Sequence, residues 1–207
     1  MKKTQLALAV AALACASSAF AQQTEGNWMM RIRAVDIQPV KKWEDAGVLN
    51  RGSSDVYVQD KTIPEVDFTY FFTKNLAAEL ILTYPQKLNV KSETLGDLGS
   101  FDALPPTLTL QYHFMPESNF RPYVGAGINY TLISNSKVNK VAPLTLENDS
   151  WGAAFQIGFD YKIGANSYIN FDVKKVQIDS DVKLNGNKVG KVTLDPLLVG
   201  IGYGFKF

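Results

Sequence analysis

His113 is the only histidine in the sequence and the side chain best suited to proton transfer at neutral pH. Catalysis would need a nucleophile or base within hydrogen-bond reach, and Thr109 and Gln111, on the same face of the chain, do not complete a triad. With one histidine and one cysteine there is no metal-ligand cluster, and no Gly-rich phosphate loop follows a strand. We therefore expect a hydrogen-bonded interior histidine, no enzymatic activity and no cofactor.

Charged side chains recur at alternate positions within apolar segments, a spacing that places them on one face of a β-strand. The charged residues assigned to this face are Arg31, Arg33, Glu65, Asp67, Glu79, Asp160, Asp172 and Lys174. Because their signs nearly balance, a structural role in a salt-bridged interior is one interpretation. The other is a polar plug with an apolar opening above it.

The overall composition describes a folded chain with an excess of aromatic residues. Formal net charge is +1, so no global field favours nucleic acid as a partner. Hydrophobic residues make up 46% and charged residues 20%, which excludes general disorder. Aromatic residues reach 12%, and the interfaces between a membrane and water are one place where they accumulate.

Residues 1–21 have the features of a secretory signal peptide. Lys2 and Lys3 precede an apolar run, and Ala19-Phe20-Ala21 is a small-x-small cleavage site. A competing interpretation makes Cys15 the acylated cysteine of a lipoprotein, but Ala12-Leu13-Ala14 matches such a site poorly. We therefore expect residues 22–207 to form the mature domain, without cysteine.

The mature chain alternates apolar and polar residues in eight segments, as expected of strands with two different faces. These segments are 28–35, 65–72, 77–84, 104–114, 123–132, 151–161, 169–174 and 197–207. No later segment is apolar for long enough to be a transmembrane helix. Aromatic residues cluster near the ends of the apolar faces, as in the girdles of barrels that span the outer membrane. The pattern predicts an all-β fold, an eight-stranded antiparallel transmembrane β-barrel.

The connections between the segments alternate in length. Residues 73–75, 115–122 and 163–167 are short links, whereas residues 36–62, 85–103, 133–150 and 177–193 are long and polar. In outer-membrane barrels the short turns face the periplasm, so we expect the long links to lie outside the cell. An even number of strands would bring both termini to the periplasmic end.

The C-terminal segment ends on three aromatic residues that share one face, Tyr203, Phe205 and Phe207. An aromatic C-terminal residue on an amphipathic strand resembles the signal that the barrel assembly machinery reads. The expected partners are therefore this machinery, outer-membrane lipid and lipopolysaccharide.

Several motifs of the mature chain resemble those of the OmpW family of small outer-membrane proteins. They are LPPT at 104–107, FRPYVGAGINY at 120–130, DSWGAA at 149–154, QxGxDY at 156–161, DP at 195–196 and GYGFKF at 202–207. The resemblance implies an eight-stranded barrel with a narrow, largely apolar interior. It also implies a channel that passes small hydrophobic solutes across the outer membrane. The alternative is a structural or surface-recognition barrel, whose long loops contact phage, toxin or host without transport.

The resemblance also implies an apolar constriction, and Ile81 fits it because this residue points inward between Glu79 and Thr83. Lys174 departs from the family pattern, since a large apolar residue is expected there. An ammonium group in a narrow lumen is costly unless it is paired.

Asp172 lies on the same face as Lys174, and Glu79 or Asp67 could reach it from elsewhere on the wall. A paired Lys174 would close the lumen to ions, so that an apolar solute leaves sideways above it. An unpaired, hydrated Lys174 would favour small anions. We therefore expect Ile81, Glu79, Thr83, Asp172 and Lys174 to line the channel.

The cleavage site makes a direct prediction about processing. The mature N-terminus should be Gln22, because signal peptidase requires the small residues of Ala19-Phe20-Ala21. Intact-mass spectrometry of the purified membrane protein should give the mass of residues 22–207. A mass that instead corresponds to acylated Cys15 would refute the signal-peptide prediction.

Overall fold

The computed structural model describes residues 26–39, 42–45, 56–93, 96–137, 144–184 and 187–207. The predicted signal peptide, its cleavage site and Cys15 lie outside these residues. Among the described residues no helix is both long enough and apolar enough to cross a membrane.

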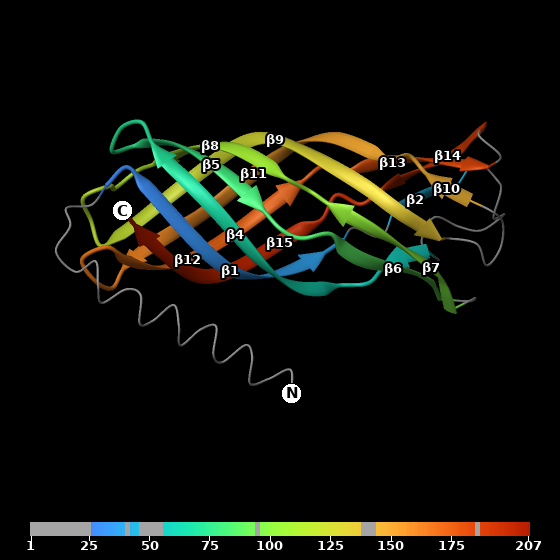
Figure 1. Ribbon diagram of the computed structural model, residues 1–207, viewed down its shortest axis with the longest axis horizontal. Coiled ribbons are helices and arrows are strands. Elements are labelled where there is room, and N and C mark those ends of the chain that lie inside the picture. Colours follow the sequence, from blue (N-terminus) through green and yellow to red (C-terminus); the bar gives the residue numbers. More distant parts are fainter. Residues whose placement is uncertain (1–25, 40–41, 46–55, 94–95, 138–143, 185–186) are drawn as a thin grey trace.

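Eight antiparallel strands close into a barrel whose axis is the long axis of the molecule (Figure 1). They are β1 (Trp28–Gln38), β4 (Lys61–Phe71), β5 (Leu76–Leu82), β8 (Thr107–His113), β9 (Phe120–Lys137), β11 (Asp149–Lys162), β12 (Ser167–Val176) and β15 (Leu197–Lys206). The strands follow the order β11-β12-β15-β1-β4-β5-β8-β9, and because β9 also pairs with β11 the sheet is a closed cylinder. Backbone hydrogen bonds join Trp28 to Phe207, so both ends of the barrel sequence meet at one end of the molecule. The predicted eight-stranded barrel is thus confirmed.

The two ends of the barrel differ. The end that carries residues 72–75, 114–119 and 163–166 is called the turn end, because each of these links is short. The opposite end carries the longer connections and is called the loop end. In Figure 1 the turn end lies at the left, beside the C-terminus.

Alternation along the strands places polar side chains inside and apolar ones outside, as predicted. In β1 the residues from Met29 to Ile37 alternate between buried and more exposed positions, with Arg31 and Arg33 among the buried ones. The register of β1 against β4 sets Arg31 opposite Asp67 and Arg33 opposite Glu65. Opposite charges that face each other across a strand pair stabilise that register.

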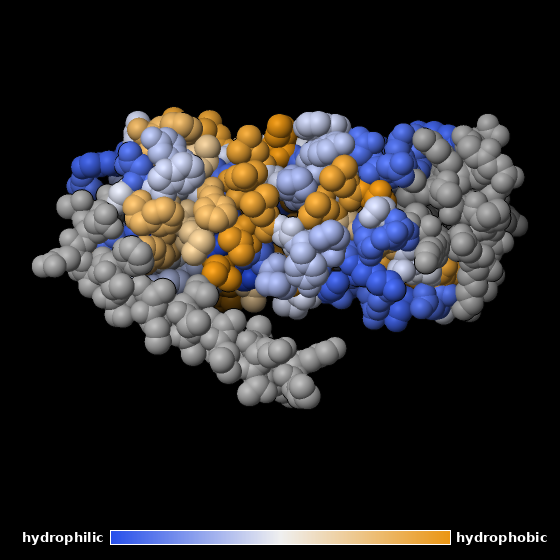
Figure 2. All heavy atoms as spheres, in the orientation of Figure 1, coloured by the Kyte–Doolittle hydropathy of each residue, from blue (hydrophilic) through white to orange (hydrophobic). Residues whose placement is uncertain are grey.

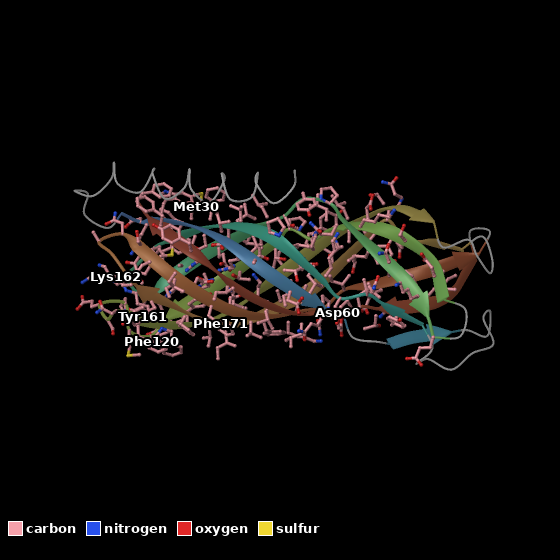
Figure 3. All side chains as sticks on the ribbon, turned by 90° about the horizontal axis from the view of Figure 1, so that it is seen from below. Met30, Asp60, Phe120, Tyr161, Lys162 and Phe171 are labelled. Atoms are coloured by element: carbon pink, nitrogen blue, oxygen red, sulfur yellow. The ribbon has the colours of Figure 1, made fainter. Side chains whose placement is uncertain are left out.

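The outer surface carries an apolar belt bounded by aromatic residues. Figure 2 shows hydrophobic side chains gathered over the half of the barrel nearer the turn end and its middle, while the coloured side chains towards the loop end are mostly hydrophilic. Trp28 and Tyr70 pack at 4.9 Å between ring centroids near the turn end, and Tyr130 and Trp151 pack at 4.6 Å towards the loop end. Figure 3 shows Phe171 on the outer side of the barrel, further from the turn end than Phe120 and Tyr161. Such rings are typical of barrels held in a bilayer.

The long links contain strands that the sequence analysis did not predict. They are β2 (Lys42–Asp45), β3 (Val56–Val58), β6 (Gln86–Ser92), β7 (Gly96–Leu104), β10 (Leu144–Leu146), β13 (Asp179–Leu184) and β14 (Asn187–Thr193). Strands β3, β6 and β7 extend the barrel sheet from β9, and the other four form a separate sheet. Leu88, Val90 and Phe101 are buried there and continue the core beyond the barrel.

The predicted strand 104–114 is wrong at its start. β7 ends at Leu104 and β8 begins at Thr107, with Pro105 and Pro106 between them. Proline has no backbone N–H to donate, so the ladder breaks at this point. β9 consequently changes partner, from β8 at Asn129 to β7 at Leu132.

The side chain of Phe207 generates a prediction about assembly. It is 45% exposed on the apolar belt, and its ring stacks on that of Phe205. Phe207→Ala should reduce the inserted fraction severalfold, because the aromatic anchor and the predicted assembly signal are both lost. Heat-modifiable mobility on gels measures the inserted fraction. The matched control is Ile201→Ala, which removes an outward apolar side chain from β15, the strand that ends directly before Phe207. Equal insertion of both variants would contradict the prediction.

Candidate functional site

A layer of buried charges crosses the lumen of the barrel. The eight inward charges expected from the sequence are all buried, and each carboxylate of the layer pairs with at least one of its cations. They are supplied by β1, β4, β5, β11 and β12. The layer therefore ties together strands from around the barrel, and not only neighbours in the sheet.

Arg31 reaches across the lumen from β1. Its guanidinium group donates to both carboxylate oxygens of Asp160, from Nε at 3.0 Å and from Nη2 at 2.8 Å. Nη1 donates to Asp67 at 3.0 Å, Thr69 at 2.6 Å and Glu79 at 3.3 Å. A bidentate contact of this kind fixes both the distance between the two side chains and their relative orientation. Arg31 thus joins β1 to β4, β5 and β11.

Arg33 makes the second set of contacts, towards the loop end. Its Nη1 lies 2.9 Å from Glu65 and 3.0 Å from Asp67, and Nη2 lies 2.9 Å from Glu79. Nε donates to the side-chain carbonyl of Asn170 at 2.7 Å. Asp67 and Glu79 are shared between the two arginines, so the pairs form one connected network.

Lys174 is paired and buried. Its Nζ lies 2.6 Å from Glu65 and 3.2 Å from Asp172. Asp172 was an expected partner, but the second partner is Glu65, where the sequence analysis suggested Glu79 or Asp67. Glu65 also accepts from Arg33, so Lys174 shares this carboxylate with the arginine network, whereas Asp67 and Glu79 each pair with both arginines.

Neutral side chains complete the layer, and sequence analysis missed their role. Gln156 donates to Glu79 at 2.8 Å and to Asp172 at 3.0 Å. The hydroxyl of Tyr123 donates to Asp172 at 2.9 Å, and Thr109 donates to Glu79 at 3.2 Å. Their inward position at the level of the charges was the available signal. Hydrogen bonds to neutral donors supply part of what the buried carboxylates lose on leaving water.

β15 is the one barrel strand that contributes no polar side chain to this layer; it contributes glycine. A Cβ atom at Gly202 would lie 2.2 Å from the carbonyl oxygen of Ile32 and 2.8 Å from Cγ of Arg33. At Gly204 it would lie 3.3 Å from Cγ of Arg31. Because these glycines carry no side chain, the aliphatic parts of Arg31 and Arg33 can pack against β15.

On the loop-end side of the layer lies an apolar chamber with a volume of about 60 Å³. Glu65 and Lys174 form part of its lining, so it ends on the charged layer. Four neutral polar residues also line it, Thr83, Gln86, Thr107 and Asn129. The rest of the lining is apolar and comes from Ile37, Pro39, Ile63, Ile81, Leu88, Ala103, Pro105, Val176, Ile178, Leu194, Pro196 and Leu198. The opening above a polar layer, considered in the sequence analysis, is therefore apolar.

The five residues expected to line a channel occupy two levels of the lumen. Ile81, which is 3% exposed, lines the apolar chamber together with Thr83 and Lys174. Glu79 and Asp172 lie within the charged layer and do not line the chamber. The structure thus brings Lys174 and Asp172 into contact, whereas Glu79 lies in the charged layer and Ile81 lines the chamber on its loop-end side.

His113 lies on the turn-end side of the layer. Its Nε2 is 3.1 Å from Oε1 of Gln111, and its ring packs 5.0 Å from the rings of both Phe71 and Tyr123. It is buried, as expected of a hydrogen-bonded interior histidine. Among the described residues no group of His, Cys, Asp or Glu could hold a metal ion.

The pairing of Lys174 generates a stability prediction. Lys174→Leu leaves Glu65 and Asp172 in the lumen without their shared cation, and losing one partner of a buried pair costs about 3 kcal/mol. Urea unfolding in lipid vesicles, followed by tryptophan fluorescence, should show a decrease of that size in the free energy of unfolding. Adding Glu65→Gln should restore part of it, because one excess carboxylate is removed. The exposed control Lys87→Leu should change little. A Lys174→Leu protein as stable as the wild type would show that the pair contributes nothing.

Comparison with known proteins identifies the family. The profile of the OmpW family matches residues 24–207. Outer membrane protein W of Escherichia coli (strain K12) is 36% identical over 218 residues, covering 100% of both chains. An uncharacterized outer-membrane protein, y4mB of Sinorhizobium fredii, is 40% identical over 222 residues, covering 97% of this chain and 94% of that protein.

Among solved structures, the crystal structure of OprG from Pseudomonas aeruginosa superimposes with a TM-score of 0.71. The two sequences are 28% identical, and the match covers 90% of this chain and 98% of OprG. The barrel, its apolar belt and these relatives agree on a non-enzymatic protein of the cell outer membrane. The chain belongs to the OmpW family.

Proposed function

We propose that this barrel passes small hydrophobic molecules across the outer membrane by way of the apolar chamber. The observation that carries the proposal is the chamber itself, since a lumen that served only to close the barrel could be filled by polar pairs throughout. Ile81 lines it beside Thr83, which leaves an alkyl surface available to a solute. Apolar lining with few polar groups is typical of sites for apolar ligands.

The charged layer limits how far such a solute can travel along the axis. Arg31 and Arg33 are at most 1% exposed, and both are engaged by carboxylates from several strands. An apolar molecule offers these groups no hydrogen bonds, so it cannot replace the contacts that it would break. The solute therefore leaves the chamber sideways, above Lys174.

The wall offers a seam for this step between β4 and the segment after β5. In the described part of the chain the ladder between β4 and β5 stops at Val66 and Leu82, although β4 begins at Lys61. Beyond that point the two sides are joined by contacts such as Thr83 Oγ1 to the Pro64 carbonyl at 3.5 Å. Another is Lys61 Nζ to the Lys87 carbonyl at 3.0 Å. Side-chain contacts separate more readily than a continuous ladder, and Ile63 and Ile81, on either side of the seam, both line the chamber.

Ile81 tests the proposal. Ile81→Asn should lower the initial rate of uptake of N-phenyl-1-naphthylamine by intact cells by about fivefold or more, because an unpaired amide in the chamber disfavours an apolar solute. Ile81→Leu, which keeps the volume and the apolar character, should retain the wild-type rate. Both variants should be compared at equal amounts of heat-modifiable barrel.

Two results would contradict the proposed function. One is an uptake rate that is the same for both variants and for cells without the protein, which would favour a structural or surface-recognition role. The other concerns planar bilayers, in which the wild type should show little ion conductance because Lys174 is paired. Anion-selective conductance that disappears in Lys174→Leu would replace hydrophobic passage with passage of small anions.

A further inference from the structure

The apolar chamber carries its neutral polar side chains on one wall. Thr107 belongs to β8 and Asn129 to β9, while Thr83 lies in the link between β5 and β6 and Gln86 begins β6. β8 faces β15 across the cylinder, since the two are four strands apart in the order of eight, and β15 supplies Leu198 to the lining. A solute in the chamber therefore meets neutral polar groups on one side and an alkyl surface on the other.

The polar groups of β8 and β9 already have partners within the protein. Nδ2 of Asn129 donates to the Thr107 hydroxyl at 2.8 Å and to the Pro106 carbonyl at 3.2 Å. The Thr107 hydroxyl donates in turn to the Pro105 carbonyl at 3.1 Å. Oδ1 of Asn129 accepts from the Thr131 hydroxyl at 2.6 Å. These side chains need no hydrogen bond from a solute.

Gln86 differs from them. It is 1% exposed, and its Nε2 donates to the Tyr84 carbonyl at 2.9 Å and to Oγ1 of Thr83 at 3.3 Å. A carbonyl oxygen can only accept, so the contact with Tyr84 identifies which end of the amide is the nitrogen. The other end, Oε1, is the one buried side-chain atom in the described lining of the chamber that has no hydrogen-bond partner.

An amide oxygen that is buried without a donor destabilises the site, and a donor brought by a ligand removes that penalty. A buried water typically makes about three hydrogen bonds, and the neighbouring side chains are already paired. A solute with one hydroxyl or N–H group needs only Oε1, because its apolar body packs against the alkyl wall. The last torsion of a glutamine side chain is broad, so a small turn of the amide presents Oε1 to that donor.

We propose that Gln86 selects, among small apolar solutes, those that carry a hydroxyl or N–H donor. This inference rests on the proposed hydrophobic passage and names the class of solute that the chamber prefers. The donor binds Oε1 of Gln86, and the apolar part of the solute lies towards Ile37 and Leu198. The hydroxyl of Thr83 links Gln86 to the Pro64 carbonyl across the seam, so a solute held at Gln86 lies beside the proposed exit.

Two probes that differ in one donor test the proposal. N-phenyl-1-naphthylamine carries an N–H group, and its N-methyl derivative carries none. Uptake by intact cells is measured at equal amounts of heat-modifiable barrel, and the rate in cells without the protein is subtracted. The wild type should take up the N–H probe faster than the methylated probe by about fivefold or more, because only the first pairs the buried acceptor.

Gln86→Met keeps the length of the side chain and removes the acceptor. It should slow uptake of the N–H probe by about fivefold or more and should not slow uptake of the methylated probe. The matched control is Gln111→Met, because Gln111 is also a buried glutamine with one unpartnered amide atom, but it is not part of the described lining of the chamber. This control should keep the wild-type ratio of the two rates.

The possible results separate this inference from the proposed passage. If neither probe enters wild-type cells faster than cells without the protein, hydrophobic passage is refuted and the selectivity with it. If both probes enter but Gln86→Met slows them equally, or Gln111→Met changes the ratio as much, passage stands and the role of Gln86 is overturned. A wild-type ratio near one also overturns it, and that measurement requires no variant to insert.

Discussion

Two buried guanidinium groups hold the walls of this barrel together across its lumen. Arg31 and Arg33 both project from β1, and their carboxylate partners come from β4, β5 and β11. Removing an arginine from water is affordable only when its donors find acceptors in good geometry. At the level of the arginines the inward side chains of most other strands are therefore polar, and the inward residues of β15 are glycine. The shape of the lumen follows from this requirement.

The charged layer also divides the interior into two compartments with different chemistry. The chamber on the loop-end side is lined largely by alkyl groups and proline. The cavity on the turn-end side, the turn-end cavity, is lined by charged residues of both signs together with polar and aromatic residues. Both compartments reach the layer, the first at Lys174 and the second at Asp160. A molecule in one compartment is thus separated from the other by ion pairs and not by a movable loop. Within the described part of the chain the two compartments have no lining residue in common.

Period-two alternation was sufficient to predict the barrel, because each barrel strand has one face in lipid and one in a polar lumen. The eight inward charges followed from the same alternation. The alternation did not predict that Glu65 is a partner of Lys174, because the stagger of strands around a closed barrel decides which inward residues lie at the same level. Glu65 is 109 residues from Lys174 along the chain, and no local pattern relates them.

The strands at the loop end were missed for a different reason. Gln86–Ser92 contains only two apolar residues, Leu88 and Val90, which is too few to establish an alternation. In Gly96–Leu104 two glycines interrupt the pattern. Pro105 and Pro106 carried a clear signal of a break, since neither can donate to a ladder, yet the alternation on both sides concealed it. The aromatic-rich outer face was recognisable from composition, whereas the turn-end cavity is not visible in any single segment. It is assembled from six strands and the turns between them.

The register between β1 and β4 has a consequence for the order in which this chain can be built. Arg31 lies opposite Asp67 and Arg33 opposite Glu65, so the first hairpin of the barrel carries two matched charge pairs of its own. The bond from Arg31 to Asp67 spans 36 residues, whereas that to Asp160 spans 129. The hairpin can therefore leave water as a nearly neutral unit, before the distant strands that complete the network have joined it. Final closure, in which β1 meets β15, then completes the contacts of Arg31 with Asp160 and of Arg33 with Asn170. It also places the glycines of β15 against the two arginine side chains.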